Sequence, residues 1–149
     1  MAGYGFHRDI SNGELDIQVA GTVVATFAAT SLTLPAGTIS LSGRVTATQA
    51  TNHATAVTNC NGTSGTITIA SVNLGAAAEA EFTVANTSVA ANDIVILSTG
   101  AYNDGAGTPI ATVSTVAANT FSITLSNPGA ADGWNDASTI NFAVIKSVA

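Results

Sequence analysis

The chain has 149 residues, of which 46% are hydrophobic and only 8% are charged, and its formal net charge is −6. Its three basic residues cannot form the cluster of Lys and Arg that phosphate backbones require, so the composition argues against nucleic-acid binding. No segment has the roughly 18 consecutive apolar residues of a membrane-spanning helix. The opening residues lack the apolar run of a signal peptide, so we expect synthesis and folding in the cytoplasm.

The low charge also bears on assembly. Soluble domains carry about 25% charged residues, and a surface with so few charges favours coverage by other subunits. We therefore expect an oligomer. The length allows one ordinary domain or two small ones. Cys60 is the single cysteine, which excludes a disulfide within the chain, and no role is assigned to it.

The first 12 residues differ from the rest of the chain. They contain Tyr4, Phe6, His7 and Arg8 in a glycine-rich stretch that shows no strand alternation. Aromatic residues and arginine are enriched among the side chains that anchor protein interfaces. We expect residues 1–12 to form an arm that docks on a partner, and the alternative is a disordered start.

Residues 13–60 begin with two predicted pairs of short extended segments. Apolar and polar side chains alternate on both sides of Ala20-Gly21, which is typical of a hairpin. A second pair is predicted around the turn sequence Pro35-Ala36-Gly37. The four segments are Leu15–Val19, Val23–Phe27, Leu32–Leu34 and Ile39–Leu41.

The stretch Val45–Ser64 is rich in Ala, Thr and Asn and has few large apolar side chains. This composition predicts a linker or a weakly packed connection, with a domain boundary near residue 60. A short Ala-rich helix over Thr46–Val57 is the alternative, although its threonines lower helix propensity.

Residues 61–149 are predicted to form the main domain of an all-β chain. Period-two alternation between Asn, Gly and Pro turns favours a β-sandwich or jelly-roll-like fold. The predicted strands are Thr66–Val72, Ala80–Ala85, Asp93–Ser98, Ala111–Val116, Thr120–Leu125 and Thr139–Ser147. Asn127-Pro128-Gly129 is expected to join the last two strands as a hairpin. The predicted core consists of Ile67, Ile69, Phe82, Val84, Ile94, Ile96, Val113, Phe121, Ile123, Leu125, Ile140, Phe142 and Val144.

No pattern in the sequence predicts catalysis, a metal site or a cofactor. His7 and His53 have no Cys, Ser or carboxylate at the spacing of a metal site or a nucleophile pair. Glu79 and Glu81 share one face of their strand and are expected to be solvated. We therefore expect a protein that is not an enzyme.

Two loops are candidates for contacts with other molecules. Asn103 and Asp104 open the glycine-rich segment Asn103–Pro109, which is expected to be a hairpin tip. The loop Asp132–Asp136 surrounds Trp134 with oxygen-bearing side chains, and here a plain polar loop is favoured over a calcium site. An exposed Trp134 would anchor a protein contact or stack on a sugar, but burial under the final strand is the stronger expectation.

Four segments in the second half of the chain resemble a module of tailed-bacteriophage virion proteins, among them head decoration (cement) proteins and fibres. The segments are Glu81–Val89, Asp93–Leu97, Thr120–Asn127 and Ile140–Ile145, and the resemblance covers about half of the chain. A weaker resemblance to the starts of small phage structural proteins lies in Asn12–Leu34. The resemblance implies a β-rich homotrimer on the virion, bound to the major capsid protein, with no catalytic residues to transfer.

Three functions then compete. A capsid decoration protein would clamp capsid subunits with its first unit or arm and expose the C-terminal β domain. A tail-fibre or adhesin component would present the loops to host surface glycans. A glycan depolymerase would need paired carboxylates facing one cleft, and the sequence shows no such pair. The short chain without heptads or repeats favours decoration over a fibre.

Overall fold

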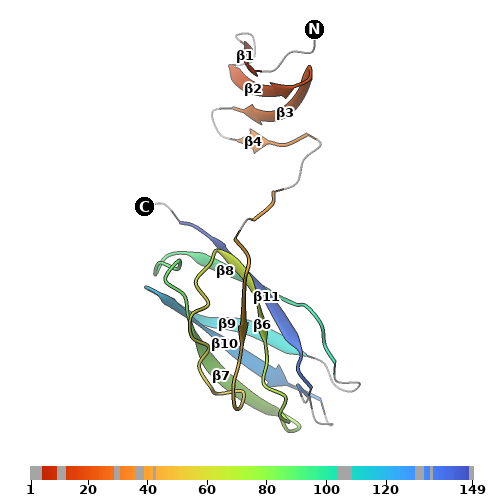
Figure 1. The fold of residues 1–149 in the computed structure, drawn as a ribbon, viewed down its shortest axis with the longest axis vertical. Coiled ribbons are helices and arrows are strands. Elements are labelled where there is room, and N and C mark those ends of the chain that lie inside the picture. Colours follow the sequence, from red (N-terminus) through yellow and green to blue (C-terminus); the bar gives the residue numbers. More distant parts are fainter. Residues whose placement is uncertain are drawn as a thin grey trace. The chain divides into compact units, whose positions relative to one another are not determined.

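The structure is a computed structural model, and it describes residues 5–9, 13–28, 31–35, 39–41, 43–103, 109–129, 133–134 and 136–147. Every regular element in these residues is a β-strand, which confirms the all-β prediction. Within these ranges we find no helix that could cross a membrane. The chain divides into two compact units, Met1–Ser40 and Leu41–Ala149, which we call the N-terminal and C-terminal units (Figure 1).

The N-terminal unit is one antiparallel sheet with the strand order β1-β2-β3-β4. Its strands are β1 (Gly5–Asp9), β2 (Glu14–Val19), β3 (Thr22–Phe27) and β4 (Leu32–Thr33). Strands β2 and β3 form the predicted hairpin. Its turn residues Ala20 and Gly21 have φ angles of 53° and 81°, and a two-residue turn of the type that matches strand twist requires positive φ at both positions.

The structure of this unit differs from two expectations, whereas docking by the first residues stays a prediction. Strand β1 pairs along its whole length with β2, from Gly5 opposite Gln18 to Asp9 opposite Glu14, so residues 5–9 form the edge of a sheet and not a separate arm. An edge strand can pair through its backbone without apolar and polar side chains alternating in its own sequence, so the sequence did not reveal β1. Ile39 and Leu41 lie outside the strands, and β4 pairs with β3 instead.

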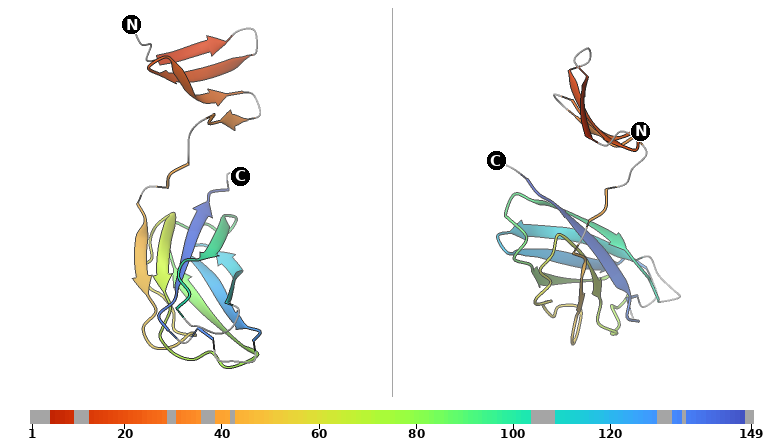
Figure 2. Two further views of the ribbon diagram at one scale, coloured as in Figure 1. Left: turned by 90° about the vertical axis from the view of Figure 1, so that its right-hand side faces the viewer. Right: turned by 45° about the horizontal axis from the view of Figure 1, so that its top comes forward.

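The C-terminal unit contains two sheets, ordered β5-β6-β11-β8 and β7-β10-β9 (Figure 2). Six of its strands confirm the six that the sequence predicts, and β5 is additional. The strands are β5 (Val45–Thr48), β6 (Ser64–Thr68), β7 (Ala78–Ala85), β8 (Ile94–Thr99), β9 (Ile110–Ala117), β10 (Thr120–Asn127) and β11 (Thr139–Ile145). The described part of the chain contains no helix over Thr46–Val57.

The expected boundary near residue 60 also differs from the structure. Strand β5 pairs in parallel with β6, with Val45 opposite Gly65. Val57 and Cys60 are buried in the core of the same unit. Small and β-branched residues are compatible with an edge strand as well as with a linker, so the composition did not reveal β5. The division between the compact units falls between residues 40 and 41.

The two sheets of the C-terminal unit share one hydrophobic core. The rings of Phe121 on β10 and Phe142 on β11 lie 5.4 Å apart, centroid to centroid, between the sheets. Strand β10 pairs with β7 and β9, whereas β11 pairs with β6 and β8. The expected β10–β11 hairpin is therefore wrong, because the turn at Asn127-Pro128-Gly129 leads from one sheet to the other.

Most of the predicted core residues are buried, but the predicted face of β8 is wrong. Ile94 and Ile96 are 58% and 51% exposed, and Val113 is only partly buried. The register with β11 places Val95 opposite Val144 and Leu97 opposite Phe142, so these alternate residues of β8 face the core.

Candidate interaction surface

The sheet of the N-terminal unit has one apolar face. Residues paired across antiparallel strands share a face, and side chains alternate along each strand. The register pairs Phe6 with Ile17, Leu15 with Phe27, and Phe27 with Leu32. We call this set the apolar face: Phe6, Leu15, Ile17, Val19, Ala25, Phe27 and Leu32.

The opposite face, which we call the polar face, carries most of the polar side chains of these strands. Its members are Glu14, Asp16, Gln18, Val23, Thr26 and Thr33. The Thr26 hydroxyl donates a 2.6 Å hydrogen bond to Asp16 across the β2–β3 pair. A β-bulge between Ile17 and Gln18 shifts the register near the turn, which increases the local twist of the sheet.

The apolar face is largely uncovered. Phe6, Leu32 and Phe27 are 76%, 55% and 42% exposed, and Leu15 and Val19 are exposed as well. In the described part of this unit, Ala25 is the one hydrophobic residue that is buried. Because complete burial of a large apolar side chain stabilises by about 1.5–3 kcal/mol, covering these five half-exposed side chains would contribute roughly 1 kcal/mol each.

The structure places only part of the expected docking arm. Phe6 lies on the edge strand β1, and the backbones of His7 and Arg8 pair with Asp16 and Leu15. Tyr4 lies outside the described residues. The arm residues that are described thus belong to the same sheet as the apolar face.

The expected loop contacts receive little support. Asn103 is exposed, but its side-chain amide donates a 2.8 Å hydrogen bond to the Ala137 carbonyl. Asp104 lies outside the described residues. Trp134 is 0% exposed, packs edge-on against Tyr102 at 5.6 Å and donates to the Ser126 carbonyl. Trp134 is therefore a core residue. This agrees with the expectation that it is buried and not with an exposed contact.

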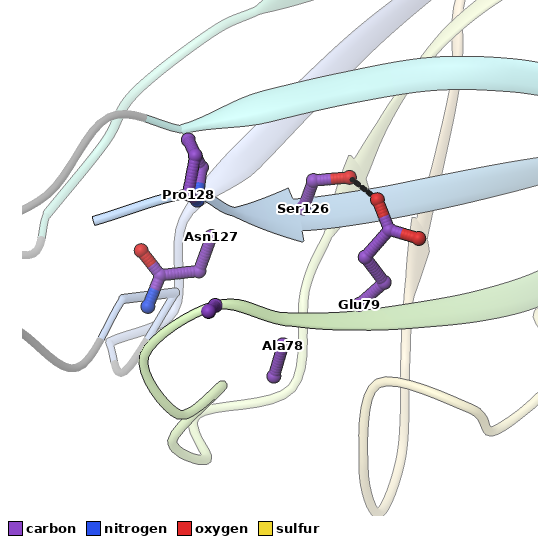
Figure 3. Close-up of a pocket in the computed structure, with 6 residues that line it drawn as sticks. Ala78, Glu79, Ser126, Asn127 and Pro128 are labelled. Carbon is purple, nitrogen blue, oxygen red and sulfur yellow. Dashed lines mark hydrogen bonds between the residues drawn. The ribbon is translucent and has the colours of Figure 1, made fainter. Parts of the chain in front are cut away.

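A surface pocket of about 310 Å³ lies at the ends of β7 and β10 (Figure 3). Among its lining residues, Glu79 is ionisable and accepts a 2.7 Å hydrogen bond from the Ser126 hydroxyl. Glu81 accepts a 3.4 Å hydrogen bond from Thr124 and does not line the pocket. Most glycosidases place two carboxylates around the scissile bond, whereas the described residues that line this pocket include one.

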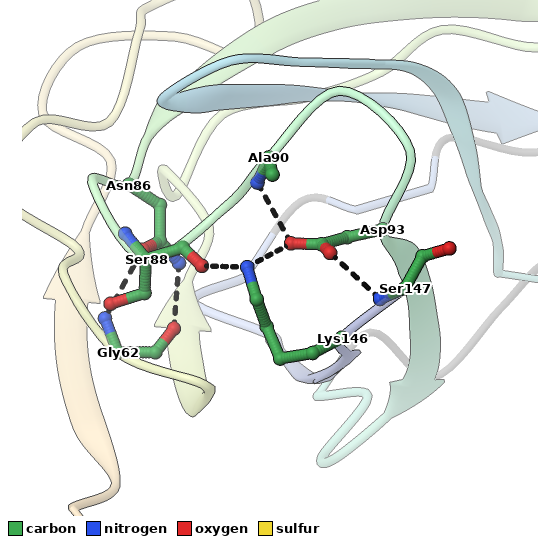
Figure 4. A network of polar contacts seen from close by, with 7 residues as sticks. All are labelled: Gly62, Asn86, Ser88, Ala90, Asp93, Lys146 and Ser147. Atoms are coloured by element: carbon green, nitrogen blue, oxygen red, sulfur yellow. Dashed lines mark hydrogen bonds and ion pairs between the residues drawn. The ribbon is translucent and has the colours of Figure 1, made fainter. Parts of the chain in front are cut away.

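An ion-paired cluster joins the loop before β8 to the end of β11 (Figure 4). Asp93 forms an ion pair with Lys146 and accepts hydrogen bonds from the backbone amides of Ala90 at 2.7 Å and Ser147 at 3.0 Å. Lys146 also donates to the Ser88 carbonyl at 2.8 Å. Lys146, with the backbone donors, lowers the pKa of Asp93 from its ordinary 3.8 to about 2. These groups bond to one another, which is typical of a structural clasp.

Two other titratable side chains are buried in the C-terminal unit. His53 Nε2 donates a 2.7 Å hydrogen bond to the Val72 carbonyl, since that oxygen can only accept. Burial lowers the pKa of His53, an effect partly offset by hydrogen bonds to the backbones of Val72 and Trp134. Burial raises the pKa of the Cys60 thiol to about 11, so little reactive thiolate exists at neutral pH.

The C-terminal unit has a smaller exposed apolar patch on β8 and β11. The patch consists of Ile94, Ile96 and Ile145, with Ile94 opposite Ile145 in the register. No group of three or more His, Cys, Asp or Glu residues in the described ranges could hold a metal ion. The apolar face of the N-terminal unit is therefore the strongest candidate for a functional surface.

Apart from Phe6, which was expected to dock as part of residues 1–12, the residues of this face were predicted as strands but not as a site. The signal was present in the sequence, because Leu15, Ile17 and Val19 alternate with polar residues and so define one apolar side. What was missing was the strand order, which brings Phe6, Phe27 and Leu32 to the same side. Comparisons with protein-family models, curated proteins and solved structures found no match for this chain.

Proposed function

We propose that this chain is a non-enzymatic capsid decoration (cement) protein that binds the outer surface of a tailed-phage head and stabilises it. The uncovered apolar face of the small N-terminal sheet carries the proposal, because such a surface serves assembly and not chemistry. The assignment to a virion rests on the resemblance of Glu81–Val89 and the three later segments to phage virion proteins.

The division of labour follows from the two units. The N-terminal unit would dock on the major capsid protein through Phe6, His7 and Arg8 of its edge strand, and Tyr4, which lies outside the described residues, is proposed to take part. The C-terminal unit, a β-sandwich or jelly-roll-like domain in a homotrimer, would face outward. Many copies with modest interfaces stabilise a shell by mass action and multivalency, so no single interface has to be strong.

The chemistry of the C-terminal unit supports a structural role. Asp93 and Lys146 bond to each other, Trp134 fills the core, and the described lining of the pocket beside Glu79 offers one carboxylate. We do not extend the proposal to a tail-fibre or adhesin role that binds host glycans, because the aromatic side chain that would stack on a sugar is buried.

Co-sedimentation with phage heads tests this proposal. The full chain and a fragment of residues 41–149 are each mixed with heads prepared from a virus that lacks the gene. The full chain should saturate the heads, whereas the fragment should remain in solution while keeping the far-ultraviolet circular dichroism of a β protein. Equal binding of the fragment would assign docking to the C-terminal unit, and failure of both to bind would refute decoration.

A further inference from the structure

The uncovered apolar face leaves the N-terminal unit without a core. A sheet with one hydrophobic face must bury that face against a second layer, and the described residues of this unit supply no such layer. Units of about 40 residues rarely fold alone without a disulfide, a metal ion or association. Residues 1–40 contain no cysteine, and their described part holds no metal-ligating cluster.

The charge of the unit limits what can cover this face. Glu14 and Asp16 lie on the polar face, whereas Arg8 on the edge strand pairs with Leu15 of the apolar face. Residues 1–40 have one positive charge, on Arg8, and three negative charges, on Asp9, Glu14 and Asp16, which gives a formal net charge of −2. Proteins that rest on anionic lipid use Lys and Arg around the apolar surface, so a membrane fits poorly. A face that is apolar apart from one arginine position on its edge strand fits a copy of itself better, and cyclic oligomers bring such identical patches together.

The folding of the N-terminal unit also favours a second copy of the chain as the partner of the apolar face. A unit that lacks a core until its face is covered has no stable folded monomer, as in many obligate oligomers. Copies of the same chain are present wherever the chain is made, whereas a capsid surface is met only later. An uncovered apolar sheet would also expose the unit to aggregation in the meantime.

We propose that copies of this chain associate through the apolar face of the N-terminal unit. Leu15, Ile17, Val19, Phe27 and Leu32 of each copy pack against the same side chains of its neighbours. Phe6, on the edge strand β1, lies at the rim of this contact. The inference goes beyond decoration, because the association forms in solution whether or not the assembly later binds a capsid.

The mass of the full-length protein in solution tests the inference. Size-exclusion chromatography with light scattering should give a wild-type mass of at least twice the chain mass of 14.7 kDa. The double variant Leu15→Lys/Phe27→Lys should fall to the mass of one chain. Gln18→Lys/Thr33→Lys on the polar face should keep the wild-type mass, and so should Ile96→Lys on the C-terminal patch.

Crosslinking separates a lost interface from a lost fold. Leu32 and Thr33 are adjacent on β4, both are exposed, and they lie on opposite faces. Leu32→Cys should give interchain crosslinks with a short bismaleimide, whereas Thr33→Cys should not. The native thiol of Cys60 is buried and does not compete. A monomeric wild type, loss of the oligomer in Ile96→Lys alone, or crosslinks confined to Thr33→Cys would overturn the inference.

Discussion

Gly65 shows how closely the C-terminal unit is packed at the residue scale. It pairs with Phe142 on one side and with Val45 on the other. A Cβ atom added at Gly65 would lie 2.5 Å from the Phe142 ring and 2.7 Å from the Val45 carbonyl oxygen. The Val45 carbonyl cannot move without disturbing the pairing of β5 with β6, and the Phe142 ring is packed against Phe121 in the core.

Substitution of this glycine measures that packing. Gly65→Ala should lower the free energy of unfolding by about 1–3 kcal/mol, the usual cost of overpacking a core. Urea denaturation followed by circular dichroism gives the value. Gly75→Ala is the matched control, because a Cβ there meets no atom within 4 Å, and it should be neutral or stabilise by up to about 1 kcal/mol. Equal stabilities of the two variants would contradict the pairing of β5, β6 and β11.

His53 gives the C-terminal unit a dependence on pH. Burial lowers the pKa of His53 in the folded chain, so the unfolded chain takes up a proton more readily. Stability is therefore complete above the ordinary pKa of 6.5 and falls as the pH drops below it. Urea midpoints measured between pH 8 and pH 5 should show this decrease, and His53→Gln should flatten it. His7→Gln is the control, and an equal effect of both substitutions would refute the assignment to His53.

The ion pair of Asp93 with Lys146 affects stability in a separate, more acidic range of pH. The pKa of Asp93 falls from 3.8 in its ordinary state to about 2 in the fold, so the carboxylate contributes stability above pH 3.8 that is lost as the pH falls toward 2. Lys146→Met should remove most of that acid sensitivity in thermal unfolding between pH 4 and pH 2. An unchanged profile would show that the backbone amides alone hold the carboxylate.

At the scale of elements, the alternating strands were predictable and the paired neighbours were not. Strands such as β7 and β10 show a clear period of two, so their buried faces followed from the sequence. In Ile94-Val95-Ile96-Leu97 every residue is apolar, and the buried face is set by pairing with β11 and not by the pattern. Strand β1, Gly-Phe-His-Arg-Asp, shows no clear alternation, and in β5 the alternation of Val and Ala with Thr involves small side chains that give a weak signal.

The orientation of β8 can be tested with two neighbouring substitutions. Threonine retains β-propensity, so the comparison isolates packing. Leu97→Thr should destabilise the C-terminal unit by about 1–3 kcal/mol, because Leu97 packs against the core. Ile96→Thr should change stability by no more than about 0.5 kcal/mol, as expected of a surface position. A larger loss in Ile96→Thr would reverse the assigned faces.

The candidate surface was also predictable only in part. The hairpin of β2 and β3 showed an apolar side in the sequence, but its size depends on β1 and β4, whose pairing the sequence did not indicate. Trp134 was weighed both as an exposed contact and as a buried residue, and burial was favoured although the surrounding loop is polar. Its packing partner Tyr102 is distant in the sequence, and its hydrogen-bond acceptor Ser126 lies eight residues earlier.

At the scale of the whole molecule, the two units differ in how their hydrophobic residues are buried. The C-terminal unit has its own core, whereas the described part of the N-terminal unit carries an exposed apolar face. Only 8% of the residues are charged, which fits a chain whose surfaces are partly covered in an assembly. Self-association through the apolar face and attachment to a capsid would together leave the C-terminal unit as the part that faces solvent.

The copy number of this chain in purified phage particles tests the decoration proposal most directly. Quantitative mass spectrometry would compare it with the major capsid protein of the same particles. A decoration protein should be present at a copy number comparable to that of the capsid protein. A handful of copies per particle would contradict decoration and place the chain in a tail or fibre, and its absence from the particles would refute a virion role.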